Sequence, residues 1–493
     1  MKSKKFAIGC IVLISLILGF IAFSVYYIDP FFHYHKPHTD RYFYPLDNNR
    51  SMNDGIIKHF EYDAIIIGTS MTDLFKTSEC DELFDVSSIK TPFPGGSYRE
   101  LNDNLITALK CNPDLKLIIR CLDSNYFLTT KDYMRDDLGT YPTYLYDSNP
   151  FNDVEYLFNK DIIFDRIYPM QKSSMSSDVV PGIESFDSYS AWQKLVTWGI
   201  NTVCQGLTTT ELKITEADEI GLSEKDRKNI SENITMNVTS LADKYPDVEF
   251  YYFFPPYSIF RYLDFENYGV LKRQLDAEQY IIELILEHDN IHLFSFNTRF
   301  DITTDLNNYK DNAHYAEWIN SLMLKWMHDG KYQLTRDNYL DYLEEEREFY
   351  TNFDYESLNG QIDYESDYYA AALLNEELSG AVPIDLLSSE GVEIDRSNGM
   401  QFHLDELGEH RYLTFYGQGT SSSSEPSVFV YDTDGEPLAQ LTVDSELLDG
   451  EKHQFVLNLP KIHGAVTIDI SGGDIDSTED AEYPYVFSEI VLY

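Results

Sequence analysis

Residues 63–72 read DAIIIGTSMT, and this short segment predicts both the architecture and the chemistry around it. Its apolar run is rich in β-branched residues, as expected for a strand that is buried on both faces of a parallel sheet. A Gly and a small hydroxyl residue then lead to Ser70, where a helix is expected to begin. The segment therefore predicts a strand end that exposes Ser70, with a helix N-terminus directed at any anion formed there. The alternative is that Ser70 is only the N-cap of that helix.

Three further short apolar runs have the same character, and longer segments with helical periodicity lie between them. The predicted strands cover residues 62–67, 115–122, 248–254 and 291–296, and the predicted helices cover residues 98–109, 224–244, 271–288 and 315–328. Strands that alternate with helices predict a doubly wound α/β fold with a parallel sheet. Ligands of such sheets gather at the carboxyl ends of the strands, where Ser70 is expected to lie.

A second polar motif follows the last of these strands. Residues 309–315 read YKDNAHY, so Asp311 and His314 stand in one loop directly before the last helix of the α/β unit. A serine nucleophile needs a base that takes its proton, and the base needs a carboxylate that fixes its tautomer and stabilises the imidazolium. Gly-x-Ser after the first strand and Asp-x-x-His after the last therefore predict a triad of Ser70, His314 and Asp311.

These motifs and the order of strands and helices resemble the SGNH (GDSL-like) hydrolase superfamily over residues 42–330. The chain is most similar to the membrane-bound extracytoplasmic members that move acyl groups in the cell envelope, such as the DltD and alginate-acetylation proteins. The resemblance implies a flavodoxin-like domain in which Ser70 is the nucleophile, His314 the general base and Asp311 its orienting partner. It also implies an oxyanion hole made of the Ser70 amide and a glycine amide, from Gly96 or else Gly95.

The third motif of the family departs from the pattern in this chain. Many relatives have Gly-x-Asn-Asp, whose Asn amide donates to the oxyanion, whereas residues 121–125 here read CLDSN. An ionised Asp123 cannot donate, so either Asn125 substitutes or the oxyanion hole has only backbone donors. Because one lost donor costs about 3 kcal/mol of transition-state stabilisation, slow turnover or a specialised acceptor is expected.

Three more side chains are candidates for substrate binding. Tyr257 follows the third predicted strand, where the prolines of FFPP fix the loop. Arg50 and Asn53 lie just before the first strand and have the chemistry to bind a sugar or a carboxylate. Structural roles are the alternative for all three.

The N-terminus carries an apolar segment of membrane-spanning length. Residues 6–28 are 23 positions without a charge, close to the roughly 20 that a helix needs to cross a bilayer. Lys2, Lys4 and Lys5 precede them, so the positive-inside rule predicts a single-pass cell-membrane protein with a cytoplasmic N-terminus and the bulk of the chain outside. The bilayer is thus an expected partner through residues 6–28. A cleaved signal peptide is the alternative.

Changes in composition divide the chain. The expected regions are a cytoplasmic tip and transmembrane anchor (1–28), an α/β domain (29–330), an acidic linker or helix (331–383) and a β-sandwich (384–493). Residues 125–215, rich in Tyr, Asp and Ser, are either a cap over the strand ends or an ordinary surface excursion. The sandwich follows from short alternating runs between Gly, Asp and Ser turns. It is a candidate sugar-binding module, and its turn at residues 472–476 is a candidate calcium site.

The charge balance argues against one class of partner. The chain has 37 Lys and Arg against 83 Asp and Glu, and the net charge of −46 repels phosphate backbones, which argues against nucleic acid as a partner. No Cys/His cluster has zinc spacing, so a structural zinc site is not indicated, and no cofactor is expected.

We therefore expect a serine esterase or O-acyltransferase that forms an acyl-enzyme at Ser70. Its expected partners are an acylated glycan or cell-envelope polymer and a membrane acyl-donor protein. Three alternatives stay open. The first is a catalytically weak or inactive carbohydrate-binding or scaffold protein with the same fold. The second is an adhesion module, in which the triad is a coincidence, and the third is a lipid or thioester hydrolase, which an apolar tunnel beside Ser70 would favour.

Overall fold

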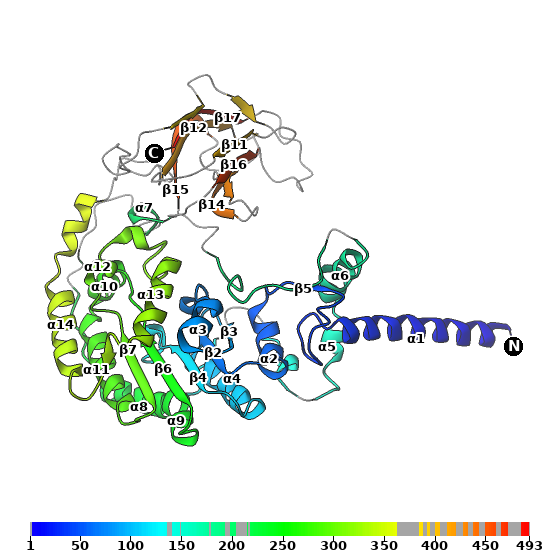
Figure 1. Cartoon of the computed structure of the whole chain (residues 1–493), viewed down its shortest axis with the longest axis horizontal. Coiled ribbons are helices and arrows are strands. Elements are labelled where there is room, and N and C mark those ends of the chain that lie inside the picture. Colours follow the sequence, from blue (N-terminus) through cyan, green and yellow to red (C-terminus); the bar gives the residue numbers. More distant parts are fainter. Residues whose placement is uncertain are drawn as a thin grey trace.

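The computed structural model describes residues 2–135, 141–147, 149–176, 179–192, 198–203, 214 and 217–361, and beyond these the strands between residues 384 and 492. It shows a mixed α/β protein with a largely parallel sheet, a long N-terminal apolar helix and a C-terminal region of antiparallel sheets (Figure 1).

The central sheet has six strands in the order β3-β2-β4-β6-β7-β8. The first five are parallel, and β8 pairs antiparallel with β7 at one edge. Their bounds are β2 (Ala64–Gly68), β3 (Ser88–Pro92), β4 (Leu117–Cys121), β6 (Glu249–Phe254), β7 (Ile291–Ser295) and β8 (Gln333–Leu334). The chain reverses its direction of winding between β2 and β4, which is where doubly wound sheets open a ligand crevice at the strands' carboxyl ends.

Both faces of this sheet are covered. Alternate residues of a strand point to opposite faces, and in β2 they enter two different hydrophobic clusters: Ile65 and Ile67 in one, Ala64 and Ile66 in the other. The neighbouring strands and the covering helices supply further side chains of each cluster. On the first face the helices are α4 (Tyr98–Cys111), α8 (Glu224–Ile234) and α11 (Leu271–Ile285), and on the second they are α10 (Ile259–Asn267) and α13 (Glu317–His328).

The predicted strands and helices are observed within a few residues of their expected ends. The segment predicted as one helix over 224–244 is α8, a π-helical turn η6 (Thr235–Thr239) and α9 (Ser240–Lys244) in succession. The remaining helices of this part are α2 (Asn49–His59), α3 (Thr77–Phe84), η2 (Ser124–Tyr126), α12 (Phe300–Thr303), η7 (Leu306–Asn308), α14 (Tyr339–Asn352) and η8 (Tyr355–Gln361).

Two features of the sheet differ from expectation. Strand β3 was not predicted, because its sequence SIKTP contains a lysine and a proline. The ammonium of Lys90 is nevertheless buried, and it donates to the carbonyls of Asp73 (2.5 Å) and Phe75 (2.8 Å). The helix expected at Ser70 is only a 3₁₀ turn, η1 (Ser70–Thr72), and α3 begins at Thr77. A three-residue turn has no useful macrodipole, so the predicted helix N-terminus is not available to an anion at Ser70.

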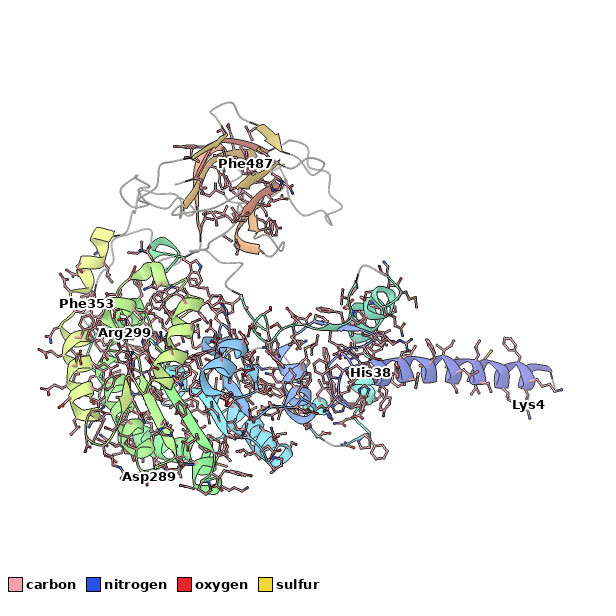
Figure 2. The ribbon with its side chains drawn as sticks, viewed as in Figure 1. Lys4, His38, Asp289, Arg299, Phe353 and Phe487 are labelled. Carbon is pink, nitrogen blue, oxygen red and sulfur yellow. The ribbon has the colours of Figure 1, made fainter. Side chains whose placement is uncertain are left out.

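The N-terminal helix α1 (Lys2–Ile28) extends away from the rest of the chain, with Lys4 near its free end and His38 where it meets the globular part (Figures 1 and 2). It is long and apolar enough to cross a membrane. Phe6 and Phe23 expose 75% and 61% of their surface, whereas Val25 and Ile28 are fully buried. The last turn of α1 therefore belongs to the core of the globular part.

The segment predicted as a cap or excursion is built from short elements. They are η3 (Thr143–Leu145), α5 (Val154–Leu157), the π-helical η4 (Ile162–Ile167), α6 (Tyr168–Ser173), β5 (Gly182–Ile183) and α7 (Ile200–Val203). Strand β5 pairs with β1 (Phe43–Tyr44). Of these elements, α5 and η4 contact α1, so much of this segment packs around the end of the N-terminal helix.

The C-terminal strands form two antiparallel sheets over a shared hydrophobic core. One sheet contains β9 (Ile384–Leu387), β10 (Val392–Ile394), β12 (Tyr412–Thr420), β15 (Asp449–Asn458) and β17 (Tyr485–Leu492), and the other contains β11 (Met400–Leu404), β13 (Ser427–Tyr431), β14 (Pro437–Thr442) and β16 (Val466–Ser471). Phe487 lies inside this region (Figure 2), 5.2 Å from the ring of Phe415. The candidate calcium turn at residues 472–476 lies outside the described residues.

Candidate active site

Ser70 lies directly beyond β2, where the ends of two neighbouring strands come close. A Cβ atom built on Gly68 would stand 2.5 Å from Cγ2 of Thr72 and 2.8 Å from Cβ of Cys121 at the end of β4. Only glycine allows this approach. The half-exposed Ser70 opens the 3₁₀ turn, and its amide, as the first of that turn, has no acceptor within it.

Ser70, His314 and Asp311 form a continuous chain of hydrogen bonds. The Ser70 hydroxyl lies 2.7 Å from Nε2 of His314. The other ring nitrogen, Nδ1, lies 2.8 Å from Oδ2 and 3.0 Å from Oδ1 of Asp311. An ionised carboxylate can only accept, so Nδ1 carries the proton and Nε2 is left as the acceptor for the serine hydroxyl. This is the tautomer that a general base needs.

The loop that holds His314 is shaped by its own sequence. The backbone amides of Ala313 and His314 donate to Oδ1 of Asp311 at 2.9 and 2.7 Å, which closes a tight Asx-type turn. The flanking Tyr309 and Tyr315 pair as a β-bridge, and both rings are buried. The two tyrosines thus hold the ends of the loop in the core while its polar centre faces Ser70.

The pKa of Asp311 reflects this turn. Burial opposes its ionisation, but the hydrogen bonds and the charge of His314, together with the amides of His314 and Ala313, outweigh burial and lower the pKa to about 2. Asp311 is therefore a carboxylate throughout the neutral range, as the orientation of His314 requires.

An aromatic residue from the segment 125–215 covers the histidine. The ring of Trp192 meets that of His314 edge to face, with centroids 5.4 Å apart. Its Nε1 donates to Oδ2 of the buried Asp73 at 3.2 Å, and Nζ of Lys310 lies 3.9 Å from its centroid. A small pocket beside Ser70 is walled by Trp192 and residues of the η1 and His314 loops. Asp73 and Lys310 were not predicted as part of the site, and only their nearness in sequence to Ser70 and Asp311 pointed to them.

The glycine predicted for the oxyanion hole is engaged elsewhere. The Gly96 amide donates to the carbonyl of Phe93 at 2.6 Å. A Cβ atom on Gly96 would stand 2.8 Å from both the Phe93 carbonyl oxygen and its Cβ, so this glycine is required by a tight turn. The prediction for Gly96 is therefore wrong in this conformation, because its N–H is not free to bind an oxyanion. Gly95 has a positive φ of 66°, and its carbonyl accepts from the Tyr126 hydroxyl at 2.6 Å.

Beyond the end of β4, Asp123 accepts hydrogen bonds from two donors. Its Oδ2 receives the Thr69 hydroxyl at 2.9 Å, and its Oδ1 receives the Asn125 amide, also at 2.9 Å. The Asn125 side chain is exposed, and its Oδ1 accepts from Arg261. Two side-chain donors are therefore left in this loop, the NH₂ group of Asn125 and the buried hydroxyl of Ser124.

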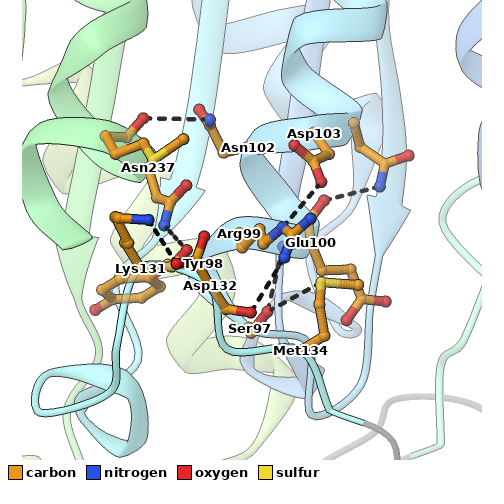
Figure 3. A network of polar contacts seen from close by, with 12 residues as sticks. Ser97, Tyr98, Arg99, Glu100, Asn102, Asp103, Lys131, Asp132, Met134 and Asn237 are labelled. Carbon is orange, nitrogen blue, oxygen red and sulfur yellow. Dashed lines mark hydrogen bonds and ion pairs between the residues drawn. The ribbon is translucent and has the colours of Figure 1, made fainter. Parts of the chain in front are cut away.

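The chain that follows Asn125 is fastened to α4 and η6 (Figure 3). Ser97 caps the start of α4 through the Glu100 amide at 3.2 Å. Arg99 donates to the carbonyl of Asp132 at 3.1 Å, and the Asn237 side chain donates to the carbonyl of Lys131 at 2.8 Å. The bonds from Arg99 and Asn237 hold the loop that begins at Asn125 against α4 and η6.

Arg50 and Asn53 both make the structural contacts that were the alternative to their predicted role in substrate binding. Arg50 donates to Oε1 of Glu100 at 3.0 Å and to the Pro94 carbonyl at 2.9 Å. Asn53 is fully buried, donates to the Pro92 carbonyl at 2.7 Å and accepts from the Tyr189 hydroxyl at 2.7 Å. Both side chains tie α2 to the end of β3.

Tyr257 is also placed differently from the prediction. Its side chain is buried, with 4% of the residue's surface exposed. It lines a cavity that also contacts Phe254, Glu278 and Asn297, and not the pocket beside Ser70. A buried ring presents no surface to a substrate, so its assignment to substrate binding is wrong. Within the part of the chain that the structure describes, no group of three His, Cys, Asp or Glu residues is placed to hold a metal.

The chain was compared with known proteins. No family model matches it, and no curated protein matches it. Among solved structures, a two-domain esterase active on acetylated mannans is similar at 9% identity over 87% of this chain and 90% of the other, with a TM-score of 0.21. A Streptococcus pneumonia protein provisionally described as a platelet activating factor is similar at 12% identity over 57% and 90%, with a TM-score of 0.28. A carbohydrate-binding module, CBM36, in complex with calcium and xylotriose has 5% identity over 23% and 98%, with a TM-score of 0.17. These TM-scores are too low to establish a shared fold, so the chemistry is inferred from the side chains alone.

Proposed function

We propose that this chain is a membrane-anchored SGNH-type serine esterase or O-acyltransferase that acts outside the cytoplasm on an acylated polysaccharide of the cell envelope. The observation that carries the proposal is the hydrogen-bonded chain from the Ser70 hydroxyl through His314 to Asp311. The strand order and the position of Ser70 beyond β2, at the crevice between β2 and β4, support the same reading.

The reaction has two half-reactions. The Ser70 oxygen attacks the ester carbonyl while its proton passes to Nε2 of His314, and the tetrahedral intermediate collapses as His314 returns that proton to the leaving alcohol. The acyl-enzyme then transfers its group to water or to a sugar hydroxyl, whose proton passes to His314 in the same way. Water gives an esterase and a sugar gives a transferase, and a membrane acyl-donor protein would supply the acyl group to the latter.

The location follows from α1. Three lysines at the start of this helix precede its apolar stretch and Asp29 follows it, so the positive-inside rule favours a cytoplasmic N-terminus and an extracytoplasmic Ser70. An enzyme tethered outside the cytoplasm in this way meets polymers of the envelope rather than cytoplasmic metabolites.

A second candidate function is a weak or inactive relative that binds glycans. The observation that favours it is the state of the oxyanion donors: Gly96 is engaged in a turn, and Asp123 accepts where an asparagine would donate. In the proposed enzyme, the Ser70 amide and the exposed NH₂ group of Asn125 are left to stabilise the oxyanion.

The test uses the full chain in detergent or nanodiscs, because a fragment that begins at Asp29 would lose Val25 and Ile28 from the core. Release of acetate from a chromogenic acetyl ester and from acetylated polysaccharide is expected, and Ser70→Ala should reduce kcat by about 10⁶-fold. The exposed Ser174→Ala is the matched control. Equal release by Ser70→Ala would contradict the proposal, and preference for long-chain acyl esters would favour a lipid hydrolase.

A further inference from the structure

Exposed apolar side chains gather in one part of the globular region. Beyond α1, sixteen large apolar side chains of the described residues are exposed, and eight of them lie between residues 151 and 180. We call this stretch the apolar segment. Phe151, Met175 and Val180 are the most exposed, at 88%, 86% and 80%. Such a concentration marks a surface that meets a protein or a membrane.

The apolar segment lies beside the end of α1. Its elements α5 and η4 contact α1, and Figure 1 shows α5 and α6 next to the place where α1 joins the globular part. The Tyr156 hydroxyl donates to Oδ1 of Asp29 at 2.9 Å, and the Tyr34 hydroxyl donates to Oδ2 of Asp153 at 3.1 Å. Because Asp29 immediately follows α1, these bonds fix the apolar segment to the residues that leave the helix.

The exposed apolar residues of this segment recur at helical spacing. Phe151, Val154 and Phe158 follow one another at intervals of three and four, and Phe164 and Tyr168 are four apart. The opposite side of the same elements buries four apolar side chains in the core, namely Tyr156, Ile162, Ile167 and Met170. The inner face is therefore complete without the outer one, which is the pattern of an amphipathic surface element.

The length of α1 places the membrane surface at the same level. Its side chains are largely exposed up to Phe23, whereas beyond it Val25 and Ile28 are fully buried and Tyr26 is still 50% exposed. Residues 6–23 span about 27 Å at 1.5 Å per residue, close to the thickness of a hydrocarbon core. A bilayer around α1 would end within about one helical turn of the point where the globular part begins.

We propose that the apolar segment is a second membrane contact, which lies in the interfacial layer of the bilayer that α1 crosses. The occupant of this face is phospholipid: aromatic side chains prefer the headgroup region, and amphipathic elements insert about 5–10 Å below it. Two contacts fix the tilt of the globular part, which a single helix would leave free. The inference depends on α1 crossing a membrane and does not depend on the chemistry of Ser70.

Quenching by brominated lipids tests the proposal in the full chain. Phe164→Trp is reconstituted into phosphatidylcholine–phosphatidylglycerol nanodiscs whose lipids carry bromine either high on the acyl chain or near its end. The emission of the native tryptophans, measured on the unaltered protein, is subtracted. We expect the added emission to be quenched most by the bromine placed high on the chain.

Two matched variants interpret the result. Ile14→Trp, in the middle of α1, should be quenched most by the deep bromine, and Tyr268→Trp, which is 74% exposed on the α/β part, should be quenched by neither. Quenching of Ile14→Trp without quenching of Phe164→Trp would overturn the proposal and leave the anchor intact. If the tryptophan of Phe164→Trp is protected from quenching only when the protein self-associates, the apolar segment contacts a second copy of the chain. That result would also overturn the proposal of a membrane contact. Absence of quenching in both would remove the anchor as well, whereas loss of esterase activity alone would leave this inference untouched.

Discussion

The two sides of the Ser70 hydroxyl are organised to different degrees. On the proton-transfer side, hydroxyl, imidazole and carboxylate are aligned at 2.7 and 2.8 Å, and the loop that carries them is closed by its own backbone amides. On the oxyanion side, the Gly96 amide already donates to the Phe93 carbonyl within a turn. The carboxylate of Asp123 accepts from two donors and offers none itself. In the proposed mechanism, the groups that serve base catalysis are therefore preorganised in this conformation, and those that serve oxyanion stabilisation are not.

This difference separates two requirements that serine enzymes usually meet together. Activation of the nucleophile and stabilisation of the tetrahedral intermediate each contribute several kcal/mol. A site with the first and little of the second would form an acyl-enzyme slowly and would depend on substrate contacts for the rest. Variants on each side of the hydroxyl test which side limits turnover.

The largest effect is expected on the organised side, from Asp311→Asn. The amide cannot hold His314 in the required tautomer, so kcat should fall by about 10⁴-fold. Steady-state kinetics with the chromogenic ester measures this loss, and a change of less than tenfold would contradict the assigned role.

The same variant predicts a change in pH dependence. Because the folded-state pKa of Asp311 is about 2, below its ordinary 3.8, its ionised form stabilises the fold above about pH 4. This contribution is lost as the pH falls toward 2. Denaturant unfolding at several pH values should show that Asp311→Asn lacks this acid-dependent part of the free energy of unfolding.

On the oxyanion side, Asp123→Asn introduces a side-chain donor in place of a carboxylate. We expect kcat to rise about tenfold, less than the 10²–10³ that a native donor contributes, because the loop was not built around it. Asp123→Ala is the matched control, since it removes the carboxylate without adding a donor. A folded Asp123→Asn protein that gains nothing over the control would show that other donors already suffice.

Trp192 is relevant to both sides of the hydroxyl. Its ring contacts His314, and it also lines the pocket beside Ser70 in which a substrate would bind. Trp192→Ala should lower kcat/KM by about 10- to 100-fold through loss of positioning, without changing which group titrates. Trp318→Ala, on an exposed face of α13, is the control. Unchanged kcat/KM in Trp192→Ala would remove this residue from the site.

The smallest effects on activity are expected at Arg50 and Asn53, whose side chains make structural contacts. Arg50→Ala leaves the buried Glu100 without its partner and should cost about 3–5 kcal/mol of stability. Asn53→Ala should cost about 1–3 kcal/mol, because two buried groups lose their hydrogen bonds. In the folded fraction, KM should stay within about threefold of the unaltered protein, and the control Lys225→Ala, on an exposed face of α8, should change stability by no more than about 0.5 kcal/mol. A selective rise in KM would restore the binding role.

The sequence patterns identified the elements that obey simple rules. β2, β4, β6 and β7 are apolar runs, and a buried parallel strand has no other requirement. The loop of Asp311 and His314 was also predictable, because its contacts lie within four residues along the chain.

Strand β3 and the contacts of Arg50 and Asn53 could not be predicted, because they depend on residues that are distant along the chain. The charged Lys90 in the middle of β3 argues against a buried strand in the sequence. In the structure its ammonium donates to the carbonyls of Asp73 and Phe75, which lie in a different part of the chain. Asn53 accepts a hydrogen bond from Tyr189, which is 136 residues away, and Arg50 donates to Glu100, which is 50 residues away. The use of the Gly96 amide depends on the local turn geometry, which composition does not reveal.

The most direct test of the central claim is whether Ser70 is an activated nucleophile. The full-length protein in nanodiscs is treated with a fluorophosphonate probe, and its intact mass is measured beside that of Ser70→Ala. A single adduct on the unaltered protein that is absent from Ser70→Ala is the predicted result. No adduct on well-folded protein, or an adduct that persists in Ser70→Ala, would contradict acyl-enzyme chemistry at this serine.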